Sequence, residues 1–179
     1  MKMYEYFLSG GSIMWILLGM SVFGVAIIGW KILNFKQEKK NIQQTASDIL
    51  KKVAEARGNV TDDMEVLDLA KDQIFTFSHD LEKGINTIKI IATIAPLLGL
   101  FGTVVGIFMA FQSIAVNGMS DPSVFAEGIS LALITTIGGL IVAIPHYISY
   151  NYLVGWINSY EVRLEKSIIT NYFKKANTK

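Results

Sequence analysis

Residues 91–113 read IATIAPLLGLFGTVVGIFMAFQS, and residues 128–151 read GISLALITTIGGLIVAIPHYISYN. Both segments are apolar, contain no carboxylate, and repeat small residues at steps of three or four. The repeats are Gly99, Gly102, Thr103, Gly106 and Ala110 in the first segment, and Gly128, Ala132, Thr135 or Thr136, Gly139 and Ala143 in the second. Small residues at helical spacing let two membrane helices approach closely. The pattern therefore predicts tight packing, with Gly99, Gly102, Gly106 and Gly139 as the packing glycines.

Composition and block length indicate a membrane protein. Of the 179 residues, 51% are hydrophobic and 17% charged, and the apolar residues gather in blocks at 13–33, 90–116 and 122–150. Each block is long enough to cross about 30 Å of hydrocarbon as a helix. We therefore expect an all-α integral membrane protein with three transmembrane helices. The net charge of +1, without a basic stripe, argues against a nucleic-acid partner, and the lack of cysteine excludes disulfides and thiolate chemistry.

The first block predicts a retained transmembrane helix and not a cleaved signal peptide. Its apolar core ends at Trp30 and Lys31, and no small-residue cleavage site follows. Basic residues gather after the first block, before the second and after the third, whereas the turn at 117–121 has none. Because cytoplasmic flanks carry the excess of lysine and arginine, we expect a periplasmic N-terminus and a cytoplasmic C-terminus. Work on the outer side would then require another protein, since the turn is too short for a domain.

Three further stripes of apolar residues have helical spacing. They are Ile42, Ala46, Ile49, Leu50 and Val53; Met64, Leu67, Ala70, Ile74, Phe77 and Leu81; and Leu153, Ile157, Tyr160, Leu164 and Ile168. The second stripe runs into the second block with Gly84 as the sole breaker, and the third continues out of the third block. Both blocks are therefore expected to belong to long helices that extend into the cytoplasm. Asp62 with Glu65, and Asp121 before Pro122, predict capped helix starts.

The threonines of the two segments admit two interpretations. Thr103 and Thr136 can each donate to the carbonyl one turn earlier, that of Gly99 and of Ala132, as hydroxyls in lipid-embedded helices usually do. Alternatively, both hydroxyls face a central space and hydrogen-bond a carboxyl group of a partner protein. Spacing alone is compatible with either arrangement.

Four other polar or aromatic residues lie near the predicted membrane boundaries. Glu127 follows Pro122 by five residues, about 8 Å along a helix, where its carboxylate is either solvated or salt-bridged, or lies at a pore mouth. His146 and Tyr147, together with Trp156, are predicted to form an interfacial belt.

The quoted segments resemble the two signature segments of the MotA/TolQ/ExbB proton-channel family, over residues 95–111 and 128–151. Residues 6–33, YFLSGGSIMWILLGMSVFGVAIIGWKIL, are similar to the first helix of ExbB-type members. The resemblance covers most of the chain and is weakest over residues 36–84. It points to ExbB and TolQ and less to MotA, which has a fourth span and a larger cytosolic domain.

The resemblance implies a homopentameric ring in the inner membrane, whose second and third helices surround the single span of a partner, ExbD or TolR. That span carries an aspartate that takes up protons from the outside and releases them inward. ExbB-type complexes energise a TonB protein for outer-membrane uptake of iron chelates or cobalamin, whereas TolQ-type complexes maintain the outer membrane during division. No cofactor is implied.

Motif position then assigns roles to individual residues. Thr103 and Thr136, with the adjacent Thr135, match the proton pathway. Leu131 stands where ExbB and TolQ often carry a glutamate, so that glutamate is dispensable here or its role has moved to Glu127 at the pore mouth.

The chain is expected to have four parts. They are residues 1–36, periplasmic N-terminus and first transmembrane helix; 37–84, cytoplasmic helical region; 85–160, pore-forming second and third transmembrane helices; and 161–179, cytoplasmic C-terminal helix.

Three classes of function compete on these observations. A proton-driven motor subunit would supply hydroxyl groups while its partner supplies the acid, since ionisable groups in the membrane are costly and mark ion paths. A passive scaffold would use the glycine stripes only to assemble oligomers. An enzyme is disfavoured, because the sequence lacks the intramembrane serine–histidine or paired-aspartate arrangement of a protease and the clustered ligands of a metal site.

Overall fold

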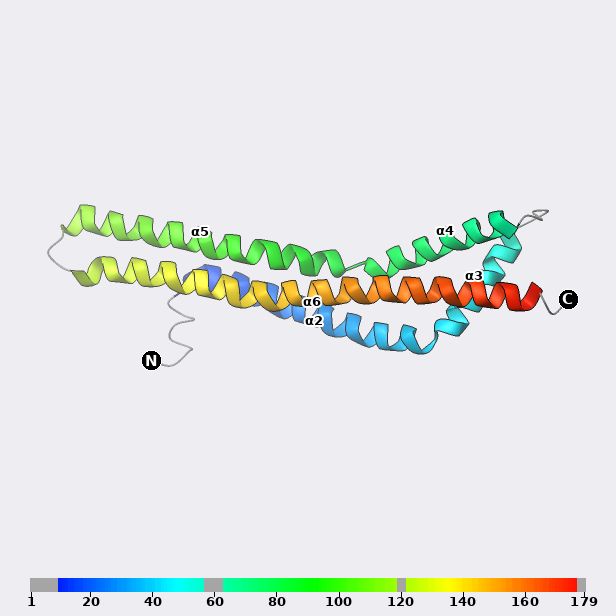
Figure 1. Ribbon diagram of the computed structural model, residues 1–179. Coiled ribbons are helices and arrows are strands. Elements are labelled where there is room, and N and C mark those ends of the chain that lie inside the picture. Colours follow the sequence, from blue (N-terminus) through cyan, green and yellow to red (C-terminus); the bar gives the residue numbers. More distant parts are fainter. Residues whose placement is uncertain (1–9, 57–62, 119–121, 177–179) are drawn as a thin grey trace. The chain divides into compact units, whose positions relative to one another are not determined.

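The computed structural model describes residues 10–56, 63–118 and 122–176, and within these ranges the chain forms helices and no strand. The helices are α2 Gly11–Lys40, α3 Ile42–Ala56, α4 Asp63–Glu82, α5 Ile85–Asn117 and α6 Pro122–Ala176 (Figure 1). Three stretches are long and apolar enough to cross a membrane, Gly11–Lys40, Ile85–Val116 and Phe125–Lys174. The predicted all-α class with three transmembrane helices is therefore confirmed.

The last helix, α6, is continuous over 55 residues and passes through Pro145 without a break. Its apolar first part and amphipathic second part thus form one long helix, as the sequence predicts. It begins at Pro122, a residue suited to the first helical position because its missing N–H has no partner to lose. The predicted caps Asp62 and Asp121, and residues 119–121 of the turn, lie outside the described residues.

Gly84 separates α4 from α5. Helix α4 ends at Glu82 and α5 begins at Ile85, while Gly84 has a φ of 84°. This left-handed conformation carries no steric penalty for glycine because it has no Cβ. The expected long helix through the second stripe and the second block is therefore interrupted at Gly84, so that α5 extends only from Ile85, whereas α6 is continuous as expected.

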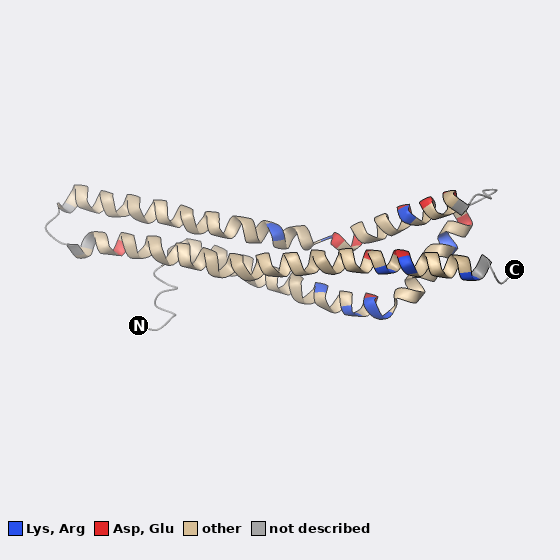
Figure 2. Ribbon diagram, viewed as in Figure 1, with Lys and Arg blue, Asp and Glu red and all other residues tan. Residues whose placement is uncertain are grey.

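The chain folds as two compact units, which we call the apolar unit (Met1–Ile28 and Asn86–Tyr150) and the charged unit (Gly29–Ile85 and Asn151–Lys179). Charged residues gather on α3, α4 and the later turns of α2 and α6, and are scarce on α5 and the first half of α6 (Figure 2). Helices α2 and α6 contribute residues to both units.

Within the apolar unit, α2, α5 and α6 pack around a small core. Its buried members are Leu17, Ile91, Ala95, Val142 and Ala143. The helices also expose large apolar side chains on their remaining faces, including Phe101, Phe108 and Leu133. Helices that are apolar on every face suit a lipid environment, where the outward side chains contact hydrocarbon.

In the charged unit, α3, α4 and α6 bury one stripe each against the others. The buried members are Ala46, Ile49, Val53, Val66, Ala70, Ile74, Tyr160, Leu164 and Ile168. All predicted positions of the third stripe are buried, and those of the first stripe belong to this cluster or pack on it. Both of these amphipathic stripes are confirmed.

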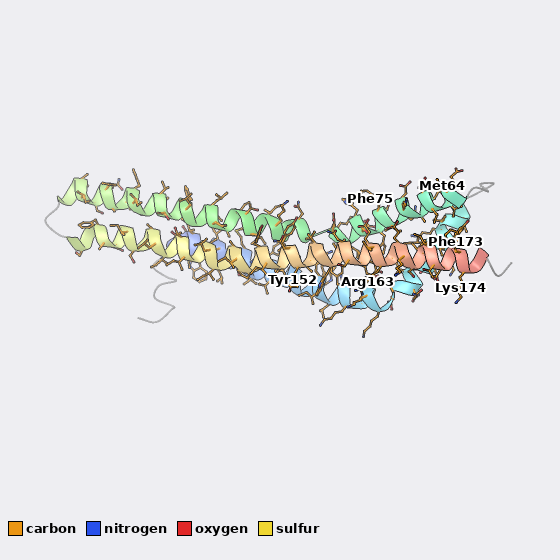
Figure 3. All side chains as sticks on the ribbon, viewed as in Figure 1. Met64, Phe75, Tyr152, Arg163, Phe173 and Lys174 are labelled. Carbon is orange, nitrogen blue, oxygen red and sulfur yellow. The ribbon has the colours of Figure 1, made fainter. Side chains whose placement is uncertain are left out.

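The phase of the second stripe is wrong in the first turns of α4. Met64 is 72% exposed, whereas Val66 is 3% exposed and belongs to the cluster. Figure 3 labels Met64 and Phe75, two exposed apolar side chains of α4. Apolar residues at both 64 and 66 offer two starting phases for a stripe that leads to Ala70, and packing against α3 and α6 selects the one through Val66.

We expect Ile168→Val to lower the stability of the charged unit by about 0.5–1.5 kcal/mol, the usual effect of removing one buried methyl group. Ile168 is 1% exposed and lies in the cluster. The matched control is Ile169→Val, since Ile169 is 37% exposed and surface changes usually stay within about 0.5 kcal/mol. Denaturant melts of the detergent-solubilised variants measure the difference, and equal midpoints for both variants would contradict the assigned face.

Candidate functional site

Helices α5 and α6 run side by side in the apolar unit (Figure 1) and touch backbone to backbone. A Cβ atom added at Gly106 would lie 2.5 Å from the Gly128 carbonyl oxygen, and one added at Gly139 would lie 2.6 Å from the Ala95 carbonyl oxygen. At Gly99 the same atom would lie 2.8 Å from the Thr135 carbonyl oxygen. No side chain larger than hydrogen fits at these positions. We call this contact the α5–α6 seam.

Gly102 makes room for a side chain instead of a backbone. A Cβ at Gly102 would collide with the Thr135 side chain, first with its Oγ1. Thr135 is fully buried in the seam, and its hydroxyl donates within α6 to the Ala132 carbonyl at 3.0 Å or the Leu131 carbonyl at 3.1 Å. Burial places Thr135 in the helix contact, so Thr103 and Thr136 are the threonines with partly exposed side chains.

The hydroxyls of Thr103 and Thr136 are hydrogen-bonded to each other across the seam. Thr103 Oγ1 also lies 3.2 Å from the Gly99 carbonyl oxygen and 3.2 Å from the Ala132 carbonyl oxygen. Thr136 Oγ1 lies 3.3 Å from the same Gly99 oxygen. The two helices thus share a compact polar cluster of two hydroxyls and two carbonyls.

Of the two interpretations of the threonines, the structure bears out the first for Thr103 and leaves the second untested. Thr103 makes the predicted bond within its own helix, to Gly99. The predicted partner of Thr136, the Ala132 carbonyl, accepts from Thr103 and Thr135 instead, and Thr136 donates across the seam to Gly99. Bonding across the seam is possible because the glycines bring the backbones together. A pore role for either hydroxyl stays a prediction.

The hydroxyl pair has two equivalent bonding arrangements. A hydroxyl has one hydrogen and two acceptor lone pairs. Either Thr136 donates to Thr103 and Thr103 donates to a carbonyl, or Thr103 donates to Thr136 and Thr136 donates to the Gly99 carbonyl. In both arrangements the pair retains a lone pair that can accept from a further donor.

The cluster lies in a long stretch without charged residues. The sequence has no aspartate, glutamate, lysine or arginine between Lys89 and Asp121, or between Glu127 and Glu161. Glu127 is exposed in the second turn of α6 and precedes Gly128, whose backbone contacts Gly106. Its place near the start of α6 is compatible with both interpretations of this carboxylate.

His146 is buried, although its position in the sequence predicted a place in an interfacial belt. Its side chain is fully buried, and Nδ1 lies 2.7 Å from the Val142 carbonyl oxygen. Because a carbonyl only accepts, Nδ1 carries a hydrogen. Nε2 faces Gly24 of α2, where an added Cβ would collide with it, and it has no partner among the described residues. Helical spacing could have predicted this burial, because His146 continues the stripe of Thr135, Gly139 and Val142 by one turn.

Comparison with known proteins adds independent findings. Residues 38–166 match the MotA/TolQ/ExbB proton channel family. An ExbB homolog from Methanothermobacter thermautotrophicus is 38% identical over 122 residues, which cover 68% of this chain and 41% of the relative. Biopolymer transport protein exbB1 from Vibrio cholerae is 34% identical over 91 residues, or 50% of this chain and 40% of the relative. An ExbB-like protein from Helicobacter pylori is 33% identical over 129 residues, 68% of each chain.

The matched regions thus span less than half of the first two relatives and about two thirds of the third.

Proposed function

Because the chain belongs to the MotA/TolQ/ExbB proton channel family, we propose that it is a channel subunit of an inner-membrane biopolymer transport complex driven by protons. The observation that carries the proposal is the hydroxyl pair of Thr103 and Thr136, which lies in an uncharged stretch of two closely packed helices. We assign the proton pathway to these two hydroxyls. The described residues contain no cluster of three potential metal ligands.

The hydroxyl pair can serve a carboxyl group in both of its protonation states. A protonated carboxyl group can donate to the lone pair that the two threonines leave open. An ionised carboxylate can instead accept from Thr103 or Thr136, which then releases its bond to a backbone carbonyl. Since an unpaired carboxylate in hydrocarbon is costly, this exchange lets an acid release its proton at the pair. The acid itself would come from a partner, because the uncharged stretches of α5 and α6 around the pair contain none.

The partner that fits this chemistry is an ExbD-type protein with one transmembrane helix and an aspartate at membrane depth. We assign residues 85–160 to the pore, with several copies of the chain, five by family resemblance, surrounding the partner's helix. Thr103 and Thr136 would line the pore, Thr135 would fix the helix spacing beside them, and Glu127 would lie at the mouth. The work would act on a TonB-type protein, and a TolR partner would assign the chain to the TolQ type instead.

We assign the orientation of the chain in the membrane from its basic residues. The lysines and arginines of the charged unit would lie in the cytoplasm, together with residues 37–84 and 161–179, and the N-terminus would be periplasmic. The exposed Gln112, in the last turns of α5, would then be near the outer end of the pore. Since the chain has no cysteine, single-cysteine labelling at position 119 tests this orientation, and labelling from the cytoplasm would reverse it.

The decisive experiment compares the chain reconstituted alone with the chain reconstituted with its co-purified partner. We expect proton flux through the chain alone to be at least about 10-fold lower, because no carrier acid then shields the charge from hydrocarbon. Vesicles that enclose a pH-sensitive dye, with a potassium gradient and valinomycin to set the membrane potential, measure this flux. The control is the complex whose partner aspartate is replaced by asparagine.

Two outcomes would overturn the proposal. If the chain alone conducts protons as fast as the complex, the carrier acid does not come from a partner. If the tagged protein purifies without any single-span acidic protein, and its cellular role is insensitive to uncouplers, the scaffold function applies.

A further inference from the structure

Helices α2 and α4 line a half-open polar cavity of about 330 Å³ in the charged unit. The lining residues that matter here are Trp30, Lys31, Asn34, Gln37 and Glu38 from α2, with Asp80 from α4. The cavity therefore offers one ammonium group, two amides, two carboxylates and an indole ring.

Lys31 is buried without a counter-anion. It is 5% exposed, and its Nζ donates to the Leu81 carbonyl oxygen at 2.8 Å and lies 5.2 Å from the centre of the Trp30 ring. The Leu81 carbonyl belongs to the last turn of α4, whose carbonyls have no helical partner. Across the described part of the chain, no carboxylate lies within ion-pair distance of Lys31. A buried charge normally requires an oppositely charged partner.

Neither carboxylate of the cavity, Asp80 or Glu38, serves as the charged partner of Lys31. Asp80 is engaged by Lys83, whose Nζ lies 2.6 Å from the Asp80 carboxylate. That hydrogen bond and charge hold the pKa of Asp80 below its usual value, so Asp80 stays ionised and paired with Lys83. Glu38 is two turns from Lys31 on α2 and forms no ion pair with a described residue. The cavity thus holds a cation and, at some distance, an anion, each without a charged partner.

The cavity lies where the apolar part of α2 ends. Trp30 and Lys31 close the first apolar block, and an indole followed by a cation is typical of the level of lipid headgroups. Trp30 and Leu33 remain largely exposed and provide apolar surface beside the cavity. A ligand that reaches this cavity from the bilayer would therefore bring a headgroup to Lys31 and keep its acyl chains on α2.

We infer that this cavity binds the headgroup of a phospholipid that carries a primary amine, namely phosphatidylethanolamine. Lys31 pairs with the phosphate, and the side-chain amides of Asn34 and Gln37 donate further hydrogen bonds to it. Glu38 accepts from the ammonium group of the ethanolamine. The bound lipid supplies the anion that Lys31 lacks, and it joins α2 to the end of α4.

The test is lipid titration of the purified full-length protein in detergent. Short-chain phosphatidylethanolamine, phosphatidylglycerol and phosphatidylcholine with identical acyl chains are added separately, and the thermal midpoint gives the affinity by mass action. Inorganic phosphate is a fourth ligand. We expect phosphatidylethanolamine to bind most tightly, and Lys31→Gln to weaken it about 10-fold or more, as expected for a lost hydrogen bond to a charged group. Lys36→Gln, which removes an exposed charge from the same helix, should bind as the wild type does.

Glu38→Gln is the second variant, and it decides the case if Lys31→Gln fails to fold without its bond to Leu81. Glu38→Gln should bind phosphatidylethanolamine no more tightly than phosphatidylglycerol. Three results overturn the inference: equal affinity for the three lipids, equal behaviour of the Lys31 and Lys36 variants, or an unchanged lipid preference in Glu38→Gln. Inorganic phosphate that binds as tightly as the lipid would also overturn it, since the site would then serve a free anion.

Discussion

Thr103→Val is expected to reduce proton flux through the complex by about 10- to 150-fold while the protein remains folded. Valine keeps the shape of threonine but removes the hydroxyl that bonds Thr136 and two carbonyls. A hydrogen bond to an ionised group contributes about 1.5–3 kcal/mol. If this bond forms as the partner's acid ionises, its loss raises the barrier to proton transfer by that energy, which gives the stated range of flux. Hydrogen bonds between membrane helices average only about 0.6 kcal/mol of stability. Thr103→Val should therefore lower the proton flux strongly while it lowers the stability of the protein only slightly.

The matched control for this variant is Thr93→Val. Thr93 lies on the same helix, is exposed, and bonds the carbonyl of Lys89 within α5. Dye-loaded vesicles measure flux, and thermal melts measure folding. Thr103→Ser should retain most of the flux because it keeps the hydroxyl. If Thr103→Val conducts protons as fast as the wild type, Thr103 is not part of the proton pathway. If the variant loses thermal stability together with its flux, the role of Thr103 is structural.

Gly139→Val is expected to prevent α5 and α6 from docking, so that little folded protein is recovered. A Cβ at this position would lie 2.6 Å from the Ala95 carbonyl oxygen and 3.1 Å from Gly99 Cα. Overpacking costs about 1–3 kcal/mol when side chains can move aside, and here the obstructing atoms are backbone. The cost should therefore exceed about 3 kcal/mol, a large part of the usual net stability of a domain. Size-exclusion profiles and thermal melts in detergent measure the loss.

Gly155→Val provides the comparison for Gly139→Val within the same helix. A Cβ at Gly155 would meet no atom within 4 Å beyond the neighbouring backbone of its own helix, so this variant tests the effect of valine in α6 without a clash against another helix. Similar recovery of both variants would mean that α5 and α6 do not depend on the seam for folding.

The sequence predicted most helices because their signals are local. Block length predicted the three spans, and Pro122 predicted the start of α6. The continuity expected between the second stripe and the second block was wrong, because the chain breaks at Gly84, whose left-handed conformation ends the helix. The amphipathic stripes of α3 and α6 were also correct, because apolar residues there occupy one face only. In α4, apolar residues at 64 and 66 offered two phases, and the choice depended on contacts with other helices.

Inside the apolar unit, sequence was less informative because α2 and α5 are apolar on all sides. Hydrophobicity then marks no inner face, and only small residues indicate which sides meet. That signal located the seam at Gly99 and Gly139, but it could not give the hydrogen-bond partner of Thr136 or the burial of His146. Lys31 was interpreted only as the end of a span, since its bond to Leu81 joins residues 50 positions apart.

The seam also has a mechanical consequence. Two helices whose backbones touch at Gly99, Gly106 and Gly139 resist bending and sliding far more than helices separated by flexible side chains. In the proposed complex, motion of a partner against this chain would therefore deform the α5–α6 pair little.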